Sequence, residues 1–455
     1  MQQRDVVVIG GSAAGLMTAT TIKRRYPQKS VTVIRNVSRT PVPCGIPYIY
    51  GTLRAVEKNL IPDEMITNQG IEIVASHVED VDRSSKIVSF KDHESIKYEK
   101  LVMATGSKPI VPPLPGIELE NVFAVAKDPF FLQRIFSALQ VARDVVVIGG
   151  GFIGVEMAEQ IARLQAEIQA DTQVSLIEMQ DCCLSLACEK EFGREVEEEL
   201  RKEGVALYLS SQVRNLEADS KGKVKAVCLS DGNTVKADVV ILGIGARPNI
   251  ELAESMGLKT DPQGGVVVDE YMQTSDPDVY SAGDCATKFS FFTGKPSGVR
   301  LASIAASEGL IAATNIFKPK TRKTIGALGA FATKVGERSI GAAGYTTAAA
   351  QQEGIEFVVG EASSPNRHPG GLPGSMNTKV KMLFRKEDGV LIGGHVCGGE
   401  AAAEMANVMA VAMQAKLTAE DLATMQYATH PLLTAAPTSY QIMLAAEFAA
   451  VQMRG

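Results

Sequence analysis

Three patterns that mark other classes of protein are missing from this chain. No run of 18 or more apolar residues lacks charge, and the nearest approach, residues 431–453, contains Pro437 and Glu447, so no membrane-spanning helix is expected. The seven cysteines have neither zinc nor iron–sulfur spacing, so no metal site is expected. The net charge of −6 and the isoelectric point near 5.6 argue against nucleic acid as a main partner.

The remaining composition is that of an ordinary globular protein. Apolar residues make up 45% of the chain and charged residues 22%, which allows a sizeable core. A chain of 455 residues is expected to form about three domains. An odd number of cysteines, with no signal peptide at the start, is typical of the reducing cytoplasm, where we expect this protein to work.

The first nucleotide-binding signal lies at the N-terminus. Residues 5–15 read DVVVIGGSAAG, which predicts a buried strand, a glycine turn and then a helix over 16–25, followed by a second strand over 30–35. This β-α-β arrangement brings backbone amides at a helix N-terminus to a pyrophosphate. The third position of the G-x-G-x-x-G fingerprint is Ser12, so this motif alone is a weak signal.

The signal repeats in full further along. Residues 144–159 read DVVVIGGGFIGVEMAE, with glycines at all three fingerprint positions. The following strand, 173–178, ends at Glu178, whose carboxylate can accept hydrogen bonds from a ribose 2′-hydroxyl. Because an acidic group there repels a 2′-phosphate and no arginine follows, NADH is expected in preference to NADPH.

The two units differ at the end of their second strands. Arg35 stands where the second unit has Glu178, and arginine donates hydrogen bonds but cannot accept them. Either Asn36 or the backbone holds that ribose, or the alignment of the two units is displaced by one residue. Two nucleotide units suggest two nucleotides, with a hydride passing between them.

Further short motifs follow in a consistent order. Residues 101–106 and 239–249 are each a strand that ends in a turn of small residues, and 280–285 places Asp284 after a glycine at the end of a strand. Each alone is more often a plain strand and turn. Beyond an Ala-rich helix over 301–317 and a basic linker over 318–323, the pattern predicts an α+β tail. Its expected strands lie near 324–335, 357–361, 380–385 and 390–397, and its helices at 399–416, 419–425 and 437–453.

Methionines recur every four residues in the tail, at 405, 409 and 413. This spacing is typical of a buried helix face or a subunit interface, and we expect the protein to form a dimer.

The hexapeptide at 43–48, PCGIPY, contains one cysteine and no partner cysteine within the next several residues. A lone cysteine is usually a small buried hydrophobic residue. A thiol at Cys44 could instead face a cofactor held by the preceding glycine turn.

With these motifs in place, the chain resembles the pyridine nucleotide–disulfide oxidoreductases along essentially its whole length. It is most similar to their single-cysteine branch, which includes CoA disulfide reductases, CoA persulfide or polysulfide reductases, NADH oxidases and NADH peroxidases. The resemblance rests on GGSAAG at 10–15, PCGIPY at 43–48, ATG at 104–106, GGGFIGVEMAE at 149–159, GIGARPN at 243–249 and SAGDC at 281–285.

The resemblance implies an α/β fold with two Rossmann-like domains and a C-terminal α+β dimerisation domain. The expected boundaries are 1–115 with 245–322 for FAD, 116–244 for NAD(H) and 323–455 for dimerisation. The implied FAD-binding residues are Gly10, Gly11, Ser12, Ala13, Gly15, Arg35, Thr105, Gly106, Asp284 and Ala302. The implied NAD-binding residues are Gly149, Gly151, Phe152, Ile153, Gly154, Glu159, Glu178 and Gly243, with Phe152 gating the nicotinamide pocket and Glu159 steadying it.

The resemblance also implies the chemistry of Cys44. The family's two-cysteine members carry C-x-x-x-x-C, but Ile49 occupies the second position here, so the oxidised form is a sulfenic acid, a persulfide or a mixed disulfide. His430 in a His-Pro pair is the candidate proton donor, as in two-cysteine relatives, where the histidine comes from the partner subunit. The glutamate that usually orients it falls here at Ala435.

The acceptor is less well defined. Lys23, Arg24 and Arg25 are similar to residues that hold CoA phosphates, but the segment 366–372 lacks the tyrosine pair of CoA enzymes, which leaves Arg367 and His368 as candidate pocket residues. We expect a reductase of low-molecular-weight disulfides, persulfides or polysulfides. The alternatives are an NADH oxidase or peroxidase, and a flavoprotein that exchanges electrons between NADH and a protein such as a ferredoxin.

Overall fold

A run of buried apolar residues places the first strand, β1 (Gln2–Ile9), at the centre of a mostly parallel sheet. It pairs in parallel with β2 (Val31–Arg35) on one side and with β6 (Ile96–Met103) on the other. The order of the sheet is β3-β2-β1-β6-β5-β4, and β19 also pairs with β6. The other strands are β3 (Ile71–Ala75), β4 (Val78–Asp82), β5 (Ile87–Phe90) and β19 (Val279–Ser281).

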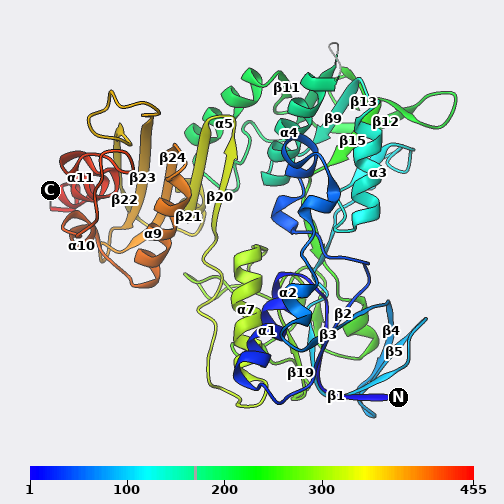
Figure 1. Cartoon of the computed structure of the whole chain (residues 1–455). Coiled ribbons are helices and arrows are strands. Elements are labelled where there is room, and N and C mark those ends of the chain that lie inside the picture. The colour runs from blue at the N-terminus through cyan, green and yellow to red at the C-terminus, as the bar shows by residue number, and fades with distance from the viewer. Residues whose placement is uncertain (169–171, 455) are drawn as a thin grey trace. The chain divides into compact units, whose positions relative to one another are not determined.

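The computed structural model describes residues 1–168 and 172–454 (Figure 1). The chain divides into two compact units. The first unit contains residues 1–112, 123–141 and 244–327, and the second contains 113–122, 142–243 and the chain from 328 onward. The boundaries of the three expected domains stay a prediction.

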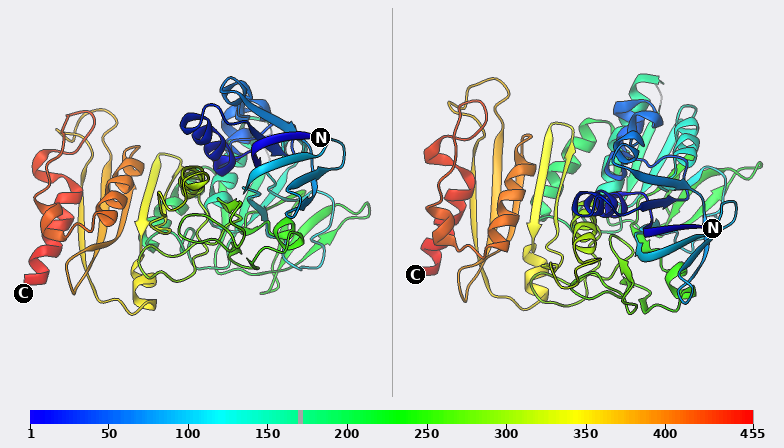
Figure 2. Two further views of the ribbon diagram at one scale, coloured as in Figure 1. Left: turned by 90° about the horizontal axis from the view of Figure 1, so that it is seen from below. Right: turned by 60° about the horizontal axis from the view of Figure 1, so that its bottom comes forward.

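Helices cover both faces of the first sheet. α1 (Ala13–Arg25) and α7 (Ala302–Asn315) lie side by side in Figures 1 and 2 and share a core with alternate residues of β1. The remaining residues of β1 form a second core with the segment that includes α6 (Glu251–Ser255). The sheet is therefore buried on both sides, as the first β-α-β motif predicts.

The contact between α1 and α7 depends on one glycine. A Cβ atom at Gly309 would lie 2.4 Å from the carbonyl oxygen of Ala14, so only glycine allows this approach. The Thr18 hydroxyl donates to the carbonyls of Ala14 (2.8 Å) and Gly309 (3.2 Å), which joins the two helices at the same place.

Short elements complete the first unit. A two-stranded ribbon pairs β7 (Ser107–Pro109) with β16 (Ala246–Pro248), and another pairs β17 (Thr260–Asp261) with β18 (Gly265–Val266). The other helices are η1 (Pro43–Gly45), η2 (Ile49–Leu53), η3 (Val56–Asn59), α2 (Glu64–Thr67) and α3 (Pro129–Leu139).

The second unit contains a parallel sheet of the order β11-β10-β9-β15. The short strand β8, at the boundary of the two units, follows β15 in the same sheet. β9 (Asp144–Ile148) leads through a glycine turn into α4 (Phe152–Ile168), which repeats the arrangement of β1 and α1. The other elements are β8 (Val122–Ala124), β10 (Gln173–Ile177), α5 (Lys190–Lys202), β11 (Val205–Tyr208) and β15 (Val239–Leu242). A smaller antiparallel sheet contains β12 (Val213–Ala218), β13 (Val224–Leu229) and β14 (Thr234–Lys236).

The tail forms an antiparallel sheet of the order β20-β21-β24-β23-β22, drawn from yellow to orange in Figure 2. The strands are β20 (Ala330–Val335), β21 (Arg338–Gly344), β22 (Phe357–Pro365), β23 (Asn377–Arg385) and β24 (Leu391–Gly398). The helices are α8 (Thr347–Gln352), α9 (Ala402–Gln414), α10 (Ala419–Ala423), the short η4 (Pro437–Ser439) and α11 (Gln441–Arg454). The sequence did not predict β21, and its first expected strand began six residues before β20.

The methionines of α9 are buried within this unit. Met409 and Met413 are almost fully buried, and their sulfur atoms lie against Gly394 and Gly344 of the sheet. The methionine spacing therefore reflects packing of α9 on its own sheet. No helix among the described residues is both long and apolar enough to cross a membrane.

We expect Gly309→Ala to lower the melting temperature, because the added methyl group must displace Ala14 and overpacking costs about 1–3 kcal/mol. Gly298→Ala is the matched control, since a Cβ there meets nothing within 4 Å. Thermal unfolding followed by circular dichroism measures both variants. A melting temperature for Gly309→Ala at or above that of the wild type would contradict the expected close contact.

Candidate active site

The first glycine loop is shaped by backbone contacts that leave no space for side chains. A Cβ at Gly10 would lie 1.9 Å from the carbonyl oxygen of Ala104, and one at Gly15 would lie 1.8 Å from the carbonyl oxygen of Gly10. α1 begins directly after Ser12, whose side chain does not cap the helix, and the first turn contains no acidic residue. This is a suitable cradle for a pyrophosphate, because helix N-terminal amides attract anions.

The ATG motif at 104–106 and the GARPN motif at 245–249 are joined by hydrogen bonds. Asn249 donates from its side chain to the carbonyl oxygen of Thr105 (2.8 Å) and from its backbone to that of Gly106 (3.0 Å). The Thr105 hydroxyl donates to the carbonyl oxygen of Asn249 (3.0 Å). Sequence reasoning quoted Asn249 within a motif but gave it no role, and the structure shows that it holds the turn at Thr105.

Asp284 lies at the carboxyl end of β19, beside the end of β6. Its carboxylate accepts a hydrogen bond from Ser107 (2.7 Å) and pairs with Lys127 (3.4 Å). The first glycine loop, the Thr105 turn and Asp284 all follow parallel strands of one sheet, and α7 begins at Ala302 near the same turn. This edge of a parallel sheet is where open α/β folds bind ligands. The predicted FAD residues of these segments are thus brought together, and the donor set suits FAD.

Strand register decides which residue of the first unit corresponds to Glu178. Ile34 pairs with Ile9 as Ile177 pairs with Ile148, so Arg35 is the structural counterpart of Glu178 and the alignment is not displaced. Both loops also begin alike, since the amide of Gly10 donates to the carbonyl oxygen of Ile34 in β2 and the amide of Gly149 donates to that of Ile177 in β10, each over 2.8 Å.

Arg35 brings a carboxylate to this edge. Its guanidinium binds both oxygens of Asp63 at 2.6 Å and also donates to the carbonyl oxygen of Ser38. The hydrogen bond from Arg35 holds the pKa of Asp63 below its ordinary value. Within the described residues, the buried Nε of Arg35 has no hydrogen-bond partner. Asn36, the other candidate, is exposed.

Cys44 is exposed, in the short helix η1, and none of the seven cysteines, all within the described residues, forms a disulfide. The other six cysteines are buried. Burial raises the pKa of the Cys182 and Cys397 thiols to about 12, which makes them unreactive. The structure thus singles out Cys44 as the accessible thiol.

Two polar side chains that sequence reasoning missed anchor the Cys44 segment. Asn59 is buried, donates to the carbonyl oxygen of Val42 (3.0 Å), and would lie 2.0 Å from a Cβ at Gly45. The hydroxyl of Thr40 donates to the carbonyl oxygen of Gly11 (2.7 Å), which ties the segment to the glycine loop. No local motif marks these residues, because each contact joins parts of the chain far apart in sequence.

The second glycine loop repeats the first. A Cβ at Gly154 would lie 1.7 Å from the carbonyl oxygen of Gly149, and one at Gly243 would lie 3.1 Å from Gly154. The Glu178 carboxylate accepts from the backbone amides of Gly150 and Gln180, so it lies against the loop where a ribose is expected. Gly151 and Ile153 are exposed at the start of α4. These features suit a dinucleotide.

Phe152 opens α4, with its ring 5.0 Å from that of Phe331. Glu159 is buried, accepts from the amide of Gly336 (2.8 Å) and pairs with Arg163 (2.8 Å). Its expected role in steadying the nicotinamide pocket stays a prediction.

Glu156 is the carboxyl group that sequence reasoning missed. It lies one helical turn after Phe152, on the same face of α4. It accepts a hydrogen bond from the Thr333 hydroxyl (2.7 Å). Burial, opposed by that hydrogen bond and reinforced by the charge of Glu159, raises its pKa to about 7. The i, i+4 spacing from Phe152 was the sequence signal that could have identified it.

Two predicted histidines of the tail lie in neighbouring loops. The amide of His368 donates to the carbonyl oxygen of Pro431 (3.0 Å), and its Nδ1 contacts the carbonyl oxygen of Thr434 (3.0 Å). His430 is exposed, and its Nδ1 accepts from the amide of Leu432 (3.3 Å). Both histidines are thus part of one loop cluster, and Arg367 bonds within it to the carbonyl of Pro373.

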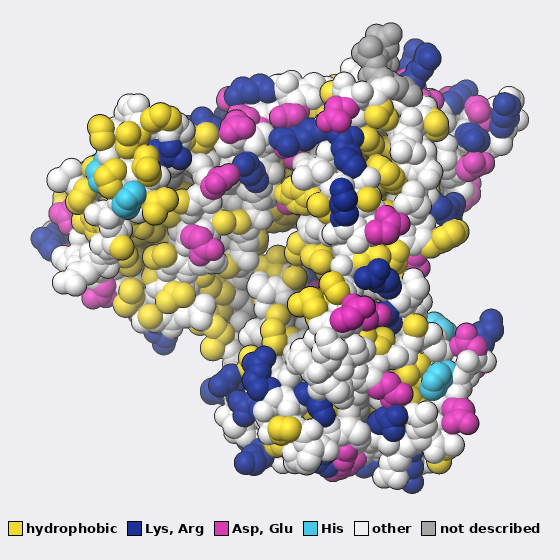
Figure 3. Space-filling view, viewed as in Figure 1, with side chains coloured by type: hydrophobic (Ala, Val, Ile, Leu, Met, Phe, Trp, Pro, Cys, Tyr) yellow, Lys and Arg dark blue, Asp and Glu magenta, His cyan; other side chains and the backbone are white. Residues whose placement is uncertain are grey.

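The predicted basic group lies at the C-terminal end of α1. Lys23 donates to the carbonyl oxygens of Pro27 (2.8 Å) and Lys29 (3.0 Å), so it holds the loop that follows its own helix. Arg24 and Arg25 are exposed. On the face shown in Figure 3, lysine and arginine side chains are interspersed with aspartate and glutamate.

Comparisons with known proteins match nearly the whole chain. Residues 4–309 match the pyridine nucleotide-disulphide oxidoreductase family, and residues 331–440 match the dimerisation domain of the same family. An NADH oxidase from Enterococcus faecalis is 32% identical over 439 residues, which cover 94% of this chain and 95% of the relative. A CoA-dependent NAD(P)H sulfur oxidoreductase from Pyrococcus abyssi is 33% identical over 404 residues, which cover 88% of each chain.

Solved structures agree with this match. The NAD-dependent persulfide reductase from A. fulgidus superimposes with a TM-score of 0.90 at 30% identity, over 99% of this chain and 84% of that one. Reduced CoADR-RHD from Bacillus anthracis gives a TM-score of 0.91 at 27% identity, over 100% and 81% of the two chains. The expected fold class is confirmed.

We expect iodoacetamide to label Cys44 much faster than any other cysteine of the native protein, because only this thiol is exposed. Peptide mass spectrometry over a time course measures each site. Cys44→Ser is the control and should take up label only slowly until denaturant is added. Equal labelling rates at Cys44 and Cys182 would contradict the arrangement.

We expect Glu156→Gln to raise the melting temperature more at pH 8 than at pH 5. A raised carboxyl pKa costs folding free energy that is absent below the unfolded pKa of 4.5 and fully present above about pH 7. A shift from 4.5 to about 7 corresponds to about 3 kcal/mol. Differential scanning fluorimetry at both pH values measures the difference.

Asp63→Asn is the matched control for this pH dependence. Its pKa is lowered by Arg35, so its stabilising contribution is lost only at more acidic pH, and its effect on melting temperature should be the same at pH 5 and pH 8. A difference for Glu156→Gln that does not grow with pH would show that this carboxyl titrates normally.

Proposed function

The chain belongs to the pyridine nucleotide-disulphide oxidoreductase family, and on that premise we propose that it is an FAD-dependent NAD(P)H oxidoreductase that reduces low-molecular-weight disulfides, persulfides or polysulfides through Cys44. One observation carries the proposal: Cys44 is the exposed thiol among seven cysteines, on a segment tied by Thr40 to the glycine loop. The sulfur-reducing relatives support the substrate class.

The first unit would hold FAD with the loop from Gly10 to Gly15, the turn at Thr105, Asp284 and the N-terminus of α7. The second unit would hold the nicotinamide nucleotide on the loop from Gly149 to Gly154. Bound FAD supplies two-electron transfer between a nicotinamide and a sulfur atom. Glu178 favours NADH, because its carboxylate accepts hydrogen bonds from a ribose and repels a 2′-phosphate.

Cys44 would act as the nucleophile. Its thiolate attacks the outer sulfur of a persulfide, R–S–SH; the S–S bond breaks, R–S⁻ leaves, and Cys44 becomes a persulfide. Two electrons from NADH then regenerate the Cys44 thiolate and release HS⁻. This cycle needs no second protein thiol, which agrees with Ile49 at the second cysteine position.

His430, which is exposed, would be the general acid for the departing thiolate, supplied by the partner subunit as in two-cysteine relatives. The match to the dimerisation domain supports a homodimer. The exposed Arg24 and Arg25 of the first unit suit an anionic carrier of sulfur such as a CoA thiol. Arg367 and His368 of the second unit stay candidate pocket residues. The seven cysteines, all within the described residues, form no disulfide, which favours a reducing compartment such as the cytoplasm.

A second candidate, NADH oxidase activity, is favoured by the relative from Enterococcus faecalis, 32% identical over nearly the full length of both chains. In that reaction Cys44 would cycle through a sulfenic acid. Electron transfer to a ferredoxin gains less support. The ferredoxin reductase for the CYP199A2 system from Rhodopseudomonas palustris is 22% identical and shows the fold alone.

We expect anaerobic oxidation of NADH by polysulfide or CoA persulfide to fall by about 1000-fold or more in Cys44→Ser, because removal of a covalent nucleophile has effects of this order. Absorbance at 340 nm measures the rate. Cys228→Ser, which alters a buried thiol of the second unit, is the control and should keep the wild-type rate. Retention of more than a tenth of the rate in Cys44→Ser would refute the proposal, and oxygen-dependent turnover with no response to sulfur would establish the second candidate.

A further inference from the structure

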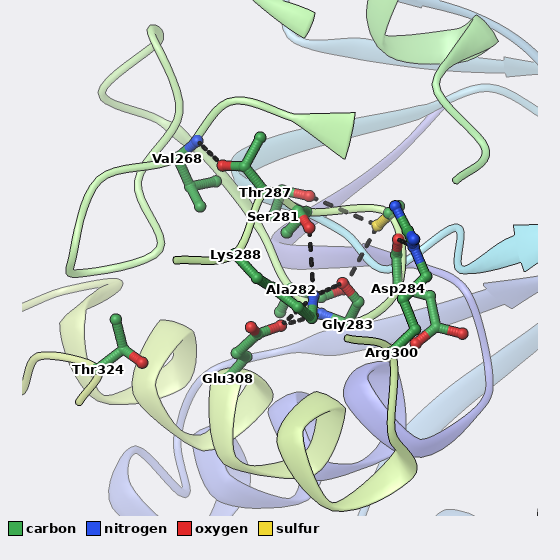
Figure 4. Close-up of polar contacts among 12 residues, drawn as sticks. Val268, Ser281, Ala282, Gly283, Asp284, Thr287, Lys288, Arg300, Glu308 and Thr324 are labelled. Carbon is green, nitrogen blue, oxygen red and sulfur yellow. Dashed lines mark hydrogen bonds and ion pairs between the residues drawn. The ribbon is translucent and has the colours of Figure 1, made fainter. Parts of the chain in front are cut away.

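A buried ion pair lies directly beneath the turn that carries Asp284. Lys288 follows this turn, and Glu308 belongs to α7; their side chains are 3% and 5% exposed, and Nζ lies 3.1 Å from Oε2. Figure 4 shows both side chains pointing toward Gly283, the residue before Asp284. The sequence singled out neither residue.

The pair binds both polar backbone groups of Gly283. The amide of Gly283 donates to Oε2 of Glu308 (2.8 Å), and its carbonyl oxygen accepts from Nζ of Lys288 (2.7 Å). Lys288 also donates to the carbonyl oxygen of Ala286 (3.2 Å). The three protons of the ammonium group therefore have three acceptors, and the pair holds the two peptide groups on either side of Gly283.

Burying such an ion pair costs folding free energy. Two buried charges lose more hydration than their attraction returns unless further hydrogen bonds satisfy them, and apolar residues often serve as well for stability. Burial raises the pKa of Glu308, against the opposing effect of Lys288. Apolar residues could not replace this pair without cost, because they would leave the buried N–H and C=O groups of Gly283 without hydrogen-bond partners.

The same place joins three segments of the cofactor edge. Gly283 has a positive φ of 85°, and a Cβ there would lie 2.8 Å from that of Ala14 in α1. Gly309, next to Glu308, packs on the carbonyl oxygen of Ala14. Arg300, just before α7, donates from Nε to the carbonyl oxygen of Asp284 (3.3 Å). A shift of Gly283 would thus move Asp284 relative to α1 and α7.

We propose that Lys288 and Glu308 act together as positioning residues for Asp284, and that they set how tightly the first unit retains FAD. The inference rests on the proposed function, since it requires this unit to bind FAD. Neither side chain needs to touch the cofactor, because the effect passes through the two peptide groups that flank Gly283.

The test measures the FAD dissociation constant of apoprotein by the quenching of flavin fluorescence on reconstitution. We expect Lys288→Met and Glu308→Gln each to weaken FAD binding about 10- to 100-fold, as expected for a lost hydrogen bond to a charged group. The double variant should bind FAD about as weakly as Lys288→Met alone, because the two residues act as one unit. Lys288→Arg keeps the charge and should recover part of the affinity.

Val279→Ala separates positioning from general stability. Val279 is fully buried in β19, the strand that leads into the turn, so its truncation lowers the melting temperature without touching the pair. We expect this variant to bind FAD within about twofold of the wild type.

The inference is overturned if Glu308→Gln, which keeps a similar shape, binds FAD as the wild type does, or if Val279→Ala weakens binding as much as Lys288→Met. Should Lys288→Met fail to fold, Glu308→Gln and Lys288→Arg decide the question by the same measurement. A wild-type apoprotein that binds no FAD would refute the proposed function itself. Tight FAD binding in every variant would refute only the role of the Lys288–Glu308 pair.

Discussion

The first unit depends on backbone segments that approach one another too closely for any side chain. Gly10 lies against Ala104, Gly15 against Gly10, and Gly283 against Ala14. Each contact joins the end of a strand or the start of a helix at one edge of the sheet. The chain therefore has little freedom in how it arranges this edge, and the polar groups found there have fixed neighbours.

On this common backbone, the two nucleotide units use opposite charges. Strand register makes Arg35 and Glu178 counterparts. Arg35 binds the carboxylate of Asp63, which is 28 residues away in sequence, whereas Glu178 is itself a carboxylate that accepts from loop amides. In the first unit the acid, Asp63, comes from a different part of the chain. The two loops thus share one backbone geometry but have side chains of opposite charge at the end of the second strand, which fits two nucleotides bound in different roles.

The sequence predicted what is local and failed where contacts are distant. Glycine spacing identified both loops, and the motif around Cys44 identified the exposed thiol, because each depends on adjacent residues. Asn59 and the Lys288–Glu308 pair carry no local signal, since their contacts span 17 and 20 residues. β21 was missed because its glycines and alanines lack the alternation and β-branched residues that mark a strand.

The way the Cys44 segment is held bears on which oxidants it can reduce. Asn59 fills the space beside Gly45, and a buried amide that bonds to the backbone of Val42 resists displacement of this loop. The other thiols are buried, so an oxidised Cys44 has no exposed cysteine of its own chain with which to form a disulfide. In the cycle proposed for Cys44, the oxidised sulfur would therefore be reduced without a second cysteine of the chain. That proposal predicts small sulfur compounds as substrates and two-electron reduction from the cofactor as the route back to the thiolate.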